Sequence, residues 1–397
     1  MSDAVLVLNA GSSSLKFTLY RLEGAGADGL AVDVGGQVEG LKLKPQFTAK
    51  DAKGRILVQE PWGEAEKDHK GALARLLGWL QVRLAGHHLL CVGHRVVHGG
   101  PDHAQPERVT PELLKTLKGY EVLAPLHQPH NLAAIEAVAA IDPELPQIAC
   151  FDTAFHRDHP AEADWFALPR HFHAEGLRRY GFHGLSYEFI ASQLPENLKN
   201  GRVVVAHLGS GASMCAIKNG RSYDSTMGFT ALDGLPMGTR PGQLDAGAVL
   251  YLMAEKGYDA KALETLFYME SGLKGLSGIS NDMRDLRASD APEAAFAIAY
   301  FTWSIVRNAG ALAAAMGGID GLVFTAGIGE KDAALRAEVI TRLAWMGFRL
   351  DTAANLKGGP RLTLEGDGKG DAPSAWVIPT DEEGMIARHS LEVLAVV

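Results

Sequence analysis

Residues 5–16 read VLVLNAGSSSLK, and this stretch decides the fold. Its first four residues are all apolar, which is typical of a buried strand, and a Gly/Ser turn follows at residues 9–14. The chain then alternates between the apolar residues Leu15, Phe17 and Leu19 and more polar neighbours, as a strand does when one of its faces is buried. The stretch therefore predicts a hairpin of two strands joined by a Gly/Ser turn.

A second stretch of the same kind lies half the chain away. Residues 202–217 read RVVVAHLGSGASMCAI, with an apolar strand, a turn at residues 207–213 and another apolar strand. A further turn at residues 218–220 predicts a second hairpin. Alignment of Gly11 with Gly209 suggests a duplicated domain, with one turn of each half facing a shared cleft. Chance similarity of two short turns is the alternative.

The rest of the chain alternates between strands and helices. Residues 24–70 are rich in glycine and charge, and we expect short antiparallel strands there. The helical spacing of apolar residues and the short apolar runs define the other elements. The expected helices cover residues 73–84, 131–141, 292–316 and 384–396, and the expected strands cover residues 89–92, 147–151, 321–325 and 376–379. This order of elements indicates an α/β fold.

The composition indicates a soluble protein of more than one domain. Of the 397 residues, 47% are hydrophobic and 21% are charged, which excludes a wholly disordered or fibrous chain. The formal net charge is −9 and no dense Lys/Arg cluster occurs, so we expect no nucleic-acid partner. The longest apolar run, at residues 294–306, is shorter than the roughly 20 residues of a membrane span, so we expect no membrane contact. Three distant cysteines, without a signal-peptide pattern, favour the cytoplasm.

Three Gly-rich turns follow predicted strands, at residues 9–14, 207–213 and 326–330. Glycine lets backbone N–H groups approach phosphate oxygens, and serine hydroxyls add further donors. Ordinary hairpins use the same residues, but three such turns favour a nucleotide. No P-loop motif occurs, and Gly327 and Gly329 lack the third glycine of a dinucleotide fingerprint.

Two arginines and two acidic positions suit phosphoryl chemistry. Arg95 follows a strand and Arg240 lies in a short loop bounded by Gly and Pro, where a guanidinium can bind a carboxylate or phosphate with two hydrogen bonds. Asp152 ends a strand and residues 381–383 are acidic, and both offer the oxygen ligands that Mg²⁺ prefers. A surface ion pair or a helix cap is the structural alternative for each of these residues.

Taken in order, six motifs resemble those of the acetate kinase family, within the broader actin-like/sugar-kinase/chaperone ATPase group. They are NAGSSSLK at residues 9–16, GHRVVHGG at 93–100, FDTAFH at 151–156, RYGFHG at 179–184, MGTR at 237–240 and AGIGE at 326–330. The resemblance runs from residue 4 to about residue 390.

The resemblance implies an α/β protein with two duplicated ribonuclease H-like/actin-like ATPase domains around a central cleft. The N-terminal domain is expected at residues 1–150 and 385–397, and the nucleotide-binding domain at residues 151–384. The resemblance further implies a homodimer and a reversible reaction in which ATP and acetate give ADP and acetyl phosphate by direct in-line transfer. ATP or ADP would be a substrate, and Mg²⁺ the cofactor, with Mn²⁺ as an alternative ion.

Five residues are implied to bind the metal ion and the acid. Asn9 and Glu382 would hold the metal ion, and Glu382 is chosen over its neighbour because the family motif places the ligand first in the pair. Arg95 would bind the substrate carboxylate, with His127 and Phe182 also at the substrate.

The other implied residues either act at the reacting centre or contact the nucleotide. Asp152, Arg240 and His183 are implied to be catalytic, with His183 stabilising the transferring phosphoryl group. Asp152 is expected to orient a Mg²⁺-bound water or Arg240 rather than to accept a proton, because a carboxylic acid is already ionised at pH 7. The residues implied to contact ATP are Lys16, His207, Leu208, Gly209, Ser210, Gly211, Asp282, Met283, Arg284, Gly327, Ile328, Gly329, Glu330 and Lys331.

Three residues depart from the family pattern. Ser210 stands where Asn is usual, Asp381 replaces the Asn of a Thr-Asn-Glu-Glu segment, and Ala231 replaces a Pro in a segment expected near the acyl pocket. The smaller residue at position 231 leaves open a propionate or butyrate kinase. A nucleotide-switch ATPase is the alternative from a different class, and an inactive binding protein is a third.

Overall fold

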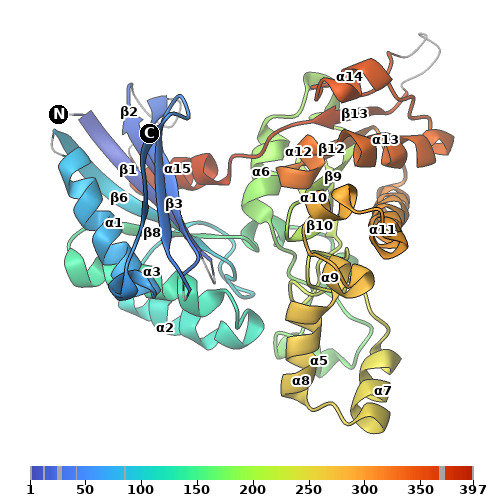
Figure 1. The fold of residues 1–397 in the computed structure, drawn as a ribbon, viewed down its shortest axis with the longest axis horizontal. Coiled ribbons are helices and arrows are strands. Elements are labelled where there is room, and N and C mark those ends of the chain that lie inside the picture. Colours follow the sequence, from blue (N-terminus) through green and yellow to red (C-terminus); the bar gives the residue numbers. More distant parts are fainter. Residues whose placement is uncertain are drawn as a thin grey trace. The chain divides into compact units, whose positions relative to one another are not determined.

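The chain forms two compact units (Figure 1). The computed structural model describes residues 2–11, 14–24, 29–41, 43–84, 86–365 and 372–395. Unit 1 comprises Met1–Ala154 and Asp381–Val397, and unit 2 comprises Phe155–Thr380. The domain boundaries were expected after residues 150 and 384, whereas the two units divide after residues 154 and 380. Asp152 and Glu382 therefore lie in unit 1, although they were expected in the second domain. None of the described helices has the length and apolar character that a membrane crossing requires.

Unit 1 is built on a mixed eight-stranded sheet, in the order β5-β4-β3-β2-β1-β6-β8-β7. Its strands are β1 (Ser2–Ala10), β2 (Ser14–Leu22), β3 (Leu30–Glu39), β4 (Gln46–Asp51), β5 (Ile56–Pro61), β6 (His87–Val96), β7 (Glu107–Arg108) and β8 (Gln147–Phe151). The antiparallel pairing of β1 with β2 confirms the first predicted hairpin, although Ser12 and Ser13 of its turn lie outside the described residues. The short antiparallel strands expected in residues 24–70 are also confirmed.

Helices cover both faces of this sheet in unit 1. Its helices are η2 (Glu64–Glu66), α1 (His69–Arg83), α2 (Pro111–Gly119), η3 (Glu121–Leu123), α3 (Gln128–Ile141) and α15 (Glu382–Val393). Leu6, Leu8 and Phe17 share a core with apolar residues of α1 and α3. On the other face α15 packs against β6 so closely that a Cβ on Gly93 would lie 2.6 Å from Cγ2 of Ile386. The last helix therefore completes unit 1.

Unit 2 repeats the order of the strands β3-β2-β1-β6-β8 of unit 1. Its five-stranded sheet has the order β11-β10-β9-β12-β13, with β9 (Arg202–Leu208), β10 (Ala212–Lys218), β11 (Arg221–Ser225), β12 (Gly321–Thr325) and β13 (Ser374–Val377). As β1 is antiparallel to β2 and parallel to β6, so β9 is antiparallel to β10 and parallel to β12. The remaining neighbours also match in direction. This shared topology is what a duplicated domain predicts.

Among the described residues, fifteen further helical elements belong to unit 2, the first of which begins at the last residue of unit 1. They are η4 (Ala154–His156), α4 (Ala161–Asp164), α5 (Arg170–Ala174), α6 (Gly184–Ser192), η5 (Glu196–Leu198), α7 (Ala246–Lys256), α8 (Ala260–Thr265), η6 (Leu266–Glu270), α9 (Gly272–Ser277), α10 (Met283–Ala288), α11 (Pro292–Met316), α12 (Ala326–Lys331), α13 (Ala333–Arg342), η7 (Ala344–Met346) and α14 (Thr352–Leu356). Tyr187 and Ile190 of α6 pack on Val203 and Val205 of β9, which anchors α6 on the sheet.

Two predicted turns differ from the structure. The turn at residues 207–213 shrinks to residues 209–211, because His207 pairs with Ser213 and extends both strands of the hairpin. Residues 326–330, expected as a Gly-rich loop, belong to the short helix α12. The buried guanidinium of Arg336 donates hydrogen bonds to the carbonyl oxygens of Gly329 and Glu330, which stabilises this turn of helix from outside its own sequence.

The last predicted strand is displaced along the chain. It was expected at residues 376–379, whereas β13 covers Ser374–Val377. Its parallel pairing with β12 sets this position, since Ser374 lies opposite Gly321 and Val377 opposite Phe324. Pro379 has no N–H group for a further ladder bond, so it cannot extend the strand in the predicted way.

Candidate active site

An arginine and an aspartate meet at the ends of two neighbouring strands of unit 1. Arg95 lies near the end of β6, and Asp152 directly follows β8, which runs parallel to β6. Both Nε and Nη2 of Arg95 donate to Oδ2 of Asp152, at 3.0 and 2.5 Å. The Asp152 side chain is 2% exposed and that of Arg95 is 19% exposed. This is a largely buried ion pair, in which Asp152 holds the guanidinium of Arg95. The expected orientation of Arg240 or of a Mg²⁺-bound water by Asp152 stays a prediction.

Asn9 and Glu382 lie beside the same guanidinium. Nη1 of Arg95 donates to Oδ1 of Asn9 at 3.4 Å, at the end of β1. Burial alone would lower the pKa of Arg95, but the carboxylates of Asp152, Glu382 and Glu383 outweigh that effect and raise this pKa above its usual value. Arg95 therefore stays charged, and the amide oxygen of Asn9 and the nearby carboxylates lie around its positive charge.

The donor chemistry of Asn9 and Glu382 fits Mg²⁺. This ion takes hard oxygen ligands, usually one or two from the protein, with water and substrate phosphates completing its octahedron. Glu382 is the first residue of α15, whose N-terminus is capped by Asp381 accepting from the N–H of Gly384 at 2.9 Å. Within the described ranges, no three His, Cys, Asp or Glu side chains cluster as a metal site. A magnesium ion bound here would thus take one amide and one carboxylate oxygen from the chain.

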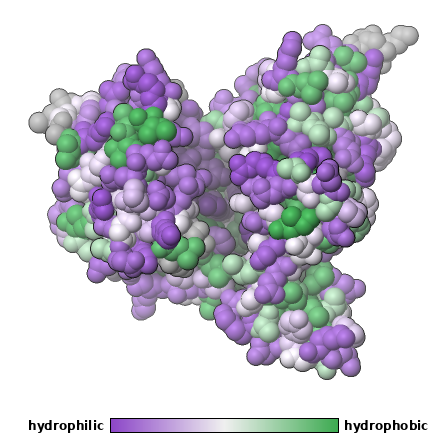
Figure 2. All heavy atoms as spheres, viewed as in Figure 1, coloured by the Kyte–Doolittle hydropathy of each residue, from purple (hydrophilic) through white to green (hydrophobic). Residues whose placement is uncertain are grey.

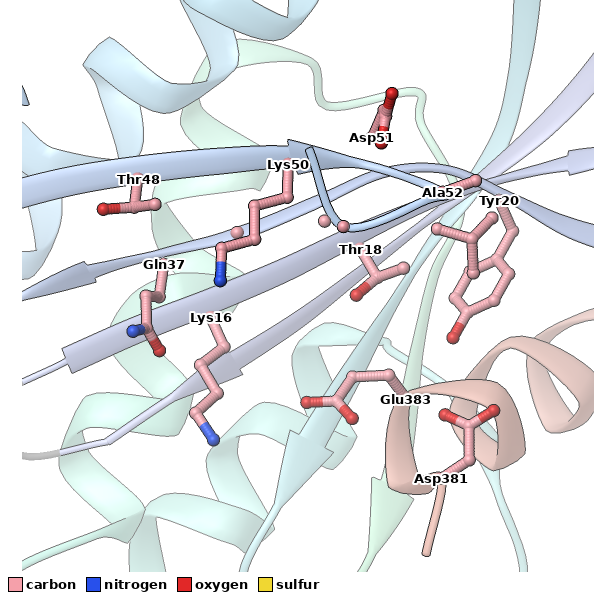
Figure 3. Close-up of a pocket in the computed structure, with 14 residues that line it drawn as sticks. Lys16, Thr18, Tyr20, Gln37, Thr48, Lys50, Asp51, Ala52, Asp381 and Glu383 are labelled. Atoms are coloured by element: carbon pink, nitrogen blue, oxygen red, sulfur yellow. The ribbon is translucent and has the colours of Figure 1, made fainter. Parts of the chain in front are cut away.

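A cavity of about 520 Å³ lies next to these groups within unit 1 (Figure 3). Lys16 from β2 and Lys50 from β4 line it on the strand side, while Asp381 and Glu383 come from the start of α15. Burial and then the charge of Glu382 raise the pKa of Glu383, and the nearby charge of Lys16 opposes this rise. Lys16, one of the residues expected to contact ATP, therefore faces a polar cavity with charges of both signs.

His127 directly precedes helix α3 and belongs to unit 1. Two side chains in the first turn of α3 hold that end of the helix in place. Oδ1 of Asn131 accepts from the N–H of Val97 at 3.0 Å, and its Nδ2 donates to the carbonyl oxygen of Ala10 at 2.6 Å. Gln128 accepts from the N–H of His98 at 3.1 Å. His127 is thereby fixed close to the segments that follow Asn9 and Arg95.

In unit 2, Arg240 and His183 converge on the turn between β9 and β10. A Cβ built on Gly211 would lie 2.9 Å from Nη2 of Arg240 and 3.4 Å from Nε2 of His183. Nη1 of Arg240 donates to the carbonyl oxygen of Ala231 at 2.8 Å, and the N–H of Gly238 donates to the carbonyl oxygen of Ser210 at 3.2 Å. Two nitrogen-bearing side chains thus approach the backbone of the expected phosphate-binding turn.

Replacing Gly211 by alanine should lower the turnover rate about 10- to 100-fold with little change in folding stability. The added methyl group would push aside the terminal nitrogen of Arg240, and a misplacement of about 1 Å can cost that much in rate. Steady-state kinetics and thermal unfolding of Gly211→Ala would measure both effects. Gly78→Ala in α1 is the matched control, because a Cβ there meets nothing within 4 Å and Gly78 has no expected role in the site. Unchanged turnover in Gly211→Ala would show that the close approach of Arg240 has no role.

His183 has a left-handed backbone, with φ 58° and ψ 27°, at the start of α6. Its ring stacks on His207 with 4.2 Å between centroids, and Nδ1 of His207 lies 2.9 Å from Oγ of Ser186. Phe182, expected at the substrate, has a buried side chain, and its carbonyl oxygen lies 3.0 Å from Nε2 of His156. Burial lowers the pKa of His156 to about 3, so this histidine is neutral and anchors the chain just before His183.

A buried carboxylate holds the segment that leads to His183. The side chain of Asp164, at the end of α4, is 10% exposed. Its partners are Arg157 at 2.5 Å, His159 at 2.9 Å, His173 at 2.8 Å and Arg178 at 3.0 Å. Its backbone carbonyl accepts from the N–H of Arg179 at 2.9 Å. Four nitrogen-bearing side chains therefore depend on one carboxylate for their arrangement.

Apart from Lys16, the residues expected to contact ATP lie in segments of unit 2 that the structure links to one another. Thr325, just before α12, pairs with His207 at the end of β9, so residues 207–211 and 327–331 lie side by side. Arg287 of α10 binds Asp332 at 3.1 Å, which joins the end of α12 to the segment holding Asp282, Met283 and Arg284. Met283 is buried, whereas Arg284 is exposed and, through its hydrogen bonds, lowers the pKa of Asp282 to about 2.

The structure therefore groups the expected residues by unit. Asn9, Lys16, Arg95, His127, Asp152 and Glu382 belong to unit 1, and the other expected residues belong to unit 2. Two residues of unit 2 that contact His183 were missed by the sequence analysis. Tyr187 lies one helical turn after His183, a spacing that could have revealed it. Ser213 lay within the predicted turn at residues 207–213, but it belongs to β10, and no local signal indicates its contact with His183.

A comparison with known proteins shows the family of the chain. A family model described as the acetokinase family matches residues 4–388 of the chain. The chain belongs to the acetokinase family. The predicted resemblance is thus confirmed over nearly the whole sequence.

Curated relatives and solved acetokinase structures are similar over almost their full length. An acetate kinase of Nitrobacter hamburgensis is 50% identical, covering 99% of this chain and 96% of its own, and one of Rhodopseudomonas palustris is 52% identical with 98% of both chains covered. A Francisella tularensis propionate kinase structure has a TM-score of 0.89 at 32% identity and covers 98% of each chain. The Porphyromonas gingivalis acetate kinase structure has a TM-score of 0.85 at 35% identity, covering 99% of this chain and all of that one. The expected α/β fold with two related domains is confirmed.

Proposed function

We propose that this acetokinase transfers the γ-phosphoryl group of ATP to acetate, reversibly and with Mg²⁺, to give acetyl phosphate and ADP. The observation that carries the proposal is the buried Arg95, which is held by Asp152 and Asn9 and stays charged. A neutral acceptor such as a sugar would not need a desolvated guanidinium. A carboxylate does, because a planar fork of N–H donors matches its two oxygens.

The proposed reaction requires the protein to neutralise charge, and it does not require a general base. Acetate is ionised at neutral pH and is already a nucleophile, but it must approach a polyanion. Arg95 would bind its carboxylate, and Arg240 with Nε2 of His183 would donate to the transferring phosphoryl group. Asp152 would hold the Arg95 guanidinium in its orientation. Mg²⁺, held by Asn9 and Glu382, would neutralise phosphate charge.

The test is ADP release from ATP in the presence of Mg²⁺, without acid and then with acetate, propionate or butyrate. We expect release that depends on the acid and is fastest with acetate, and an Arg240→Ala variant as a control should show none. Release without any acid would overturn the proposal in favour of a nucleotide switch. A rate that is highest with propionate would instead match the Francisella tularensis propionate kinase, and a rate highest with butyrate would likewise change the substrate but keep the mechanism.

The protein is also proposed to act as a homodimer in the cytoplasm. Helix α7 is rich in apolar residues, yet none of its residues is buried in the single chain, and Leu250 and Tyr251 are 66% and 52% exposed. Apolar surface is visible over the part of unit 2 that carries α7 and α8 (Figure 2). Such a face is suited to a second copy of the chain. The three cysteines are all buried thiols, which suits a reducing compartment.

A further inference from the structure

The side chain of His183 is held by a hydroxyl chain that runs into the core of unit 2. Nδ1 of His183 lies 2.8 Å from Oγ of Ser213, and the hydroxyl of Tyr187 lies 2.5 Å from the same Oγ. Ser213 comes from β10, and Tyr187 lies one turn along α6 from His183. Both partners are fully buried. The imidazole is thus fixed at the nitrogen that faces away from Gly211.

The backbone of His183 adds a second constraint. His183 has a positive φ, which a residue other than glycine rarely adopts and which persists only where the surroundings impose it. Here the left-handed turn places the side chain between Ser213 and the turn that contains Gly211. The strain and the hydroxyl chain together select one position of the ring.

The hydroxyl chain can also select which ring nitrogen carries the proton. A hydroxyl group has a single hydrogen, so Ser213 can donate to only one of its two partners. When Tyr187 donates to Ser213, Ser213 donates to Nδ1 of His183, and the hydrogen of the neutral imidazole is left on Nε2. Nε2 is the atom that shares the space above Gly211 with the Nη2 donor of Arg240. The opposite direction would aim a lone pair of Nε2 at that space and repel an anion.

We propose that Ser213 and Tyr187 are positioning residues, which hold His183 as the tautomer that carries its hydrogen on Nε2. This inference rests on the proposed function of His183 as a donor to the phosphoryl group. Its effect on the reaction is indirect, since both hydroxyls act through His183. If Ser213 and Tyr187 only filled space in the core, replacing them would change stability but not the tautomer of His183.

The experiment combines ¹⁵N NMR of the histidine rings with kinetics on the intact protein. A His183→Gln variant identifies the resonances of His183. In the natural protein at neutral pH we expect the Nε2–H tautomer. In Ser213→Ala and in Tyr187→Phe we expect a mixture of both tautomers, together with a fall in kcat of about tenfold or more and little change in the KM for ATP. Tyr187→Phe keeps Ser213 and the ring of Tyr187, so it provides the test if Ser213→Ala does not fold.

Ser374→Ala is the matched control. Ser374 is also a buried serine on a strand of unit 2, where its Oγ accepts from Nε1 of Trp376 at 2.9 Å. It lies at the beginning of β13, beside the beginning of β12 and away from the end that carries His207. This variant should lose stability but keep the His183 tautomer and kcat. The proposal is overturned if Ser213→Ala and Tyr187→Phe keep a pure Nε2–H tautomer, or if their kcat falls no further than that of Ser374→Ala.

The NMR result separates this proposal from the proposed function. If the natural protein releases no ADP with any acid, the proposed function fails, while the tautomer shift in the two variants still tests the hydroxyl chain. If ADP release is normal and the His183 tautomer is the same in both variants as in the natural protein, the proposed role of Ser213 and Tyr187 is wrong and the proposed function stands.

Discussion

Replacing Arg95 by alanine should lower kcat/KM for acetate at least about 10³-fold and destabilise the protein by about 3–5 kcal/mol. The loss of activity follows from the lost fork of donors for the acid. The loss of stability follows because the carboxylate of Asp152, 2% exposed, would stay buried without its charged partner. Kinetics with acetate and urea unfolding would measure the two effects on the same variant.

A double-variant cycle separates binding from stability. Arg95→Ala together with Asp152→Ala removes both charges, so part of the lost stability should return while activity does not. Arg95→Lys keeps the charge without the planar fork and should fold better than Arg95→Ala, yet remain poor with acetate. Arg342→Ala is the control, because its partner Glu338 is 38% exposed and such a pair contributes only about 0–1 kcal/mol. Acetate turnover near normal in Arg95→Ala would contradict the assignment of Arg95 to the acid.

Replacing Asp164 by asparagine should destabilise the protein by about 3–5 kcal/mol, because Arg157 and Arg178 would lose a buried countercharge that they share. The amide also has one acceptor oxygen where the carboxylate had two. Since Arg179 and the chain toward His183 are tied to the same residue, turnover should fall as well. Thermal unfolding at neutral pH measures the first effect. Asp158→Asn is the matched control, since Asp158 forms an exposed pair with Arg221 and its loss should have almost no effect.

The same carboxylate predicts a pH dependence of stability. Burial alone would raise the pKa of Asp164, but hydrogen bonds from His159 and His173 and the charge of Arg157 outweigh burial and hold this pKa far below its usual value. The unfolded chain therefore binds the proton more readily than the folded one. The contribution of Asp164 to stability is complete above about pH 4 and is lost as the pH falls further. The stability difference between the natural protein and Asp164→Asn should shrink in acid, and a difference that is constant down to pH 2 would contradict this assignment.

The elements that the sequence predicted correctly are those with local causes. Residues 292–316 form a helix at the expected bounds because Pro292 suits its first turn and Gly317 adopts the left-handed conformation that ends it. Residues 147–151 form a strand as expected, because a short apolar run between turn residues has few alternatives. Their causes lie within a few residues of each element.

The features that the sequence could not predict arise from distant residues. The pairing of Arg95 with Asp152 depends on the parallel register of two strands, and no spacing in the chain indicates it. Helix α12 contains two glycines and was expected to be a loop, but Arg336 binds its carbonyl groups. The contact of Ser213 with His183 likewise joins a strand to a helix. The motifs predict which residues act in the site, whereas the partners of these residues are set by tertiary structure.

The placement of α15 in unit 1 has a consequence for synthesis on the ribosome. Translation runs from the N-terminus, so α15 emerges only after all of unit 2 has been made, and until then the face of β6 around Gly93 lacks its cover. Unit 2 can finish folding first, which reverses the usual order in which an N-terminal domain folds before the next one. A copy whose translation stops before residue 381 lacks Glu382 and keeps apolar strand surface exposed. Exposed apolar strand surface is prone to aggregation and is bound by chaperones, so we expect such an incomplete copy to aggregate or to be held by a chaperone.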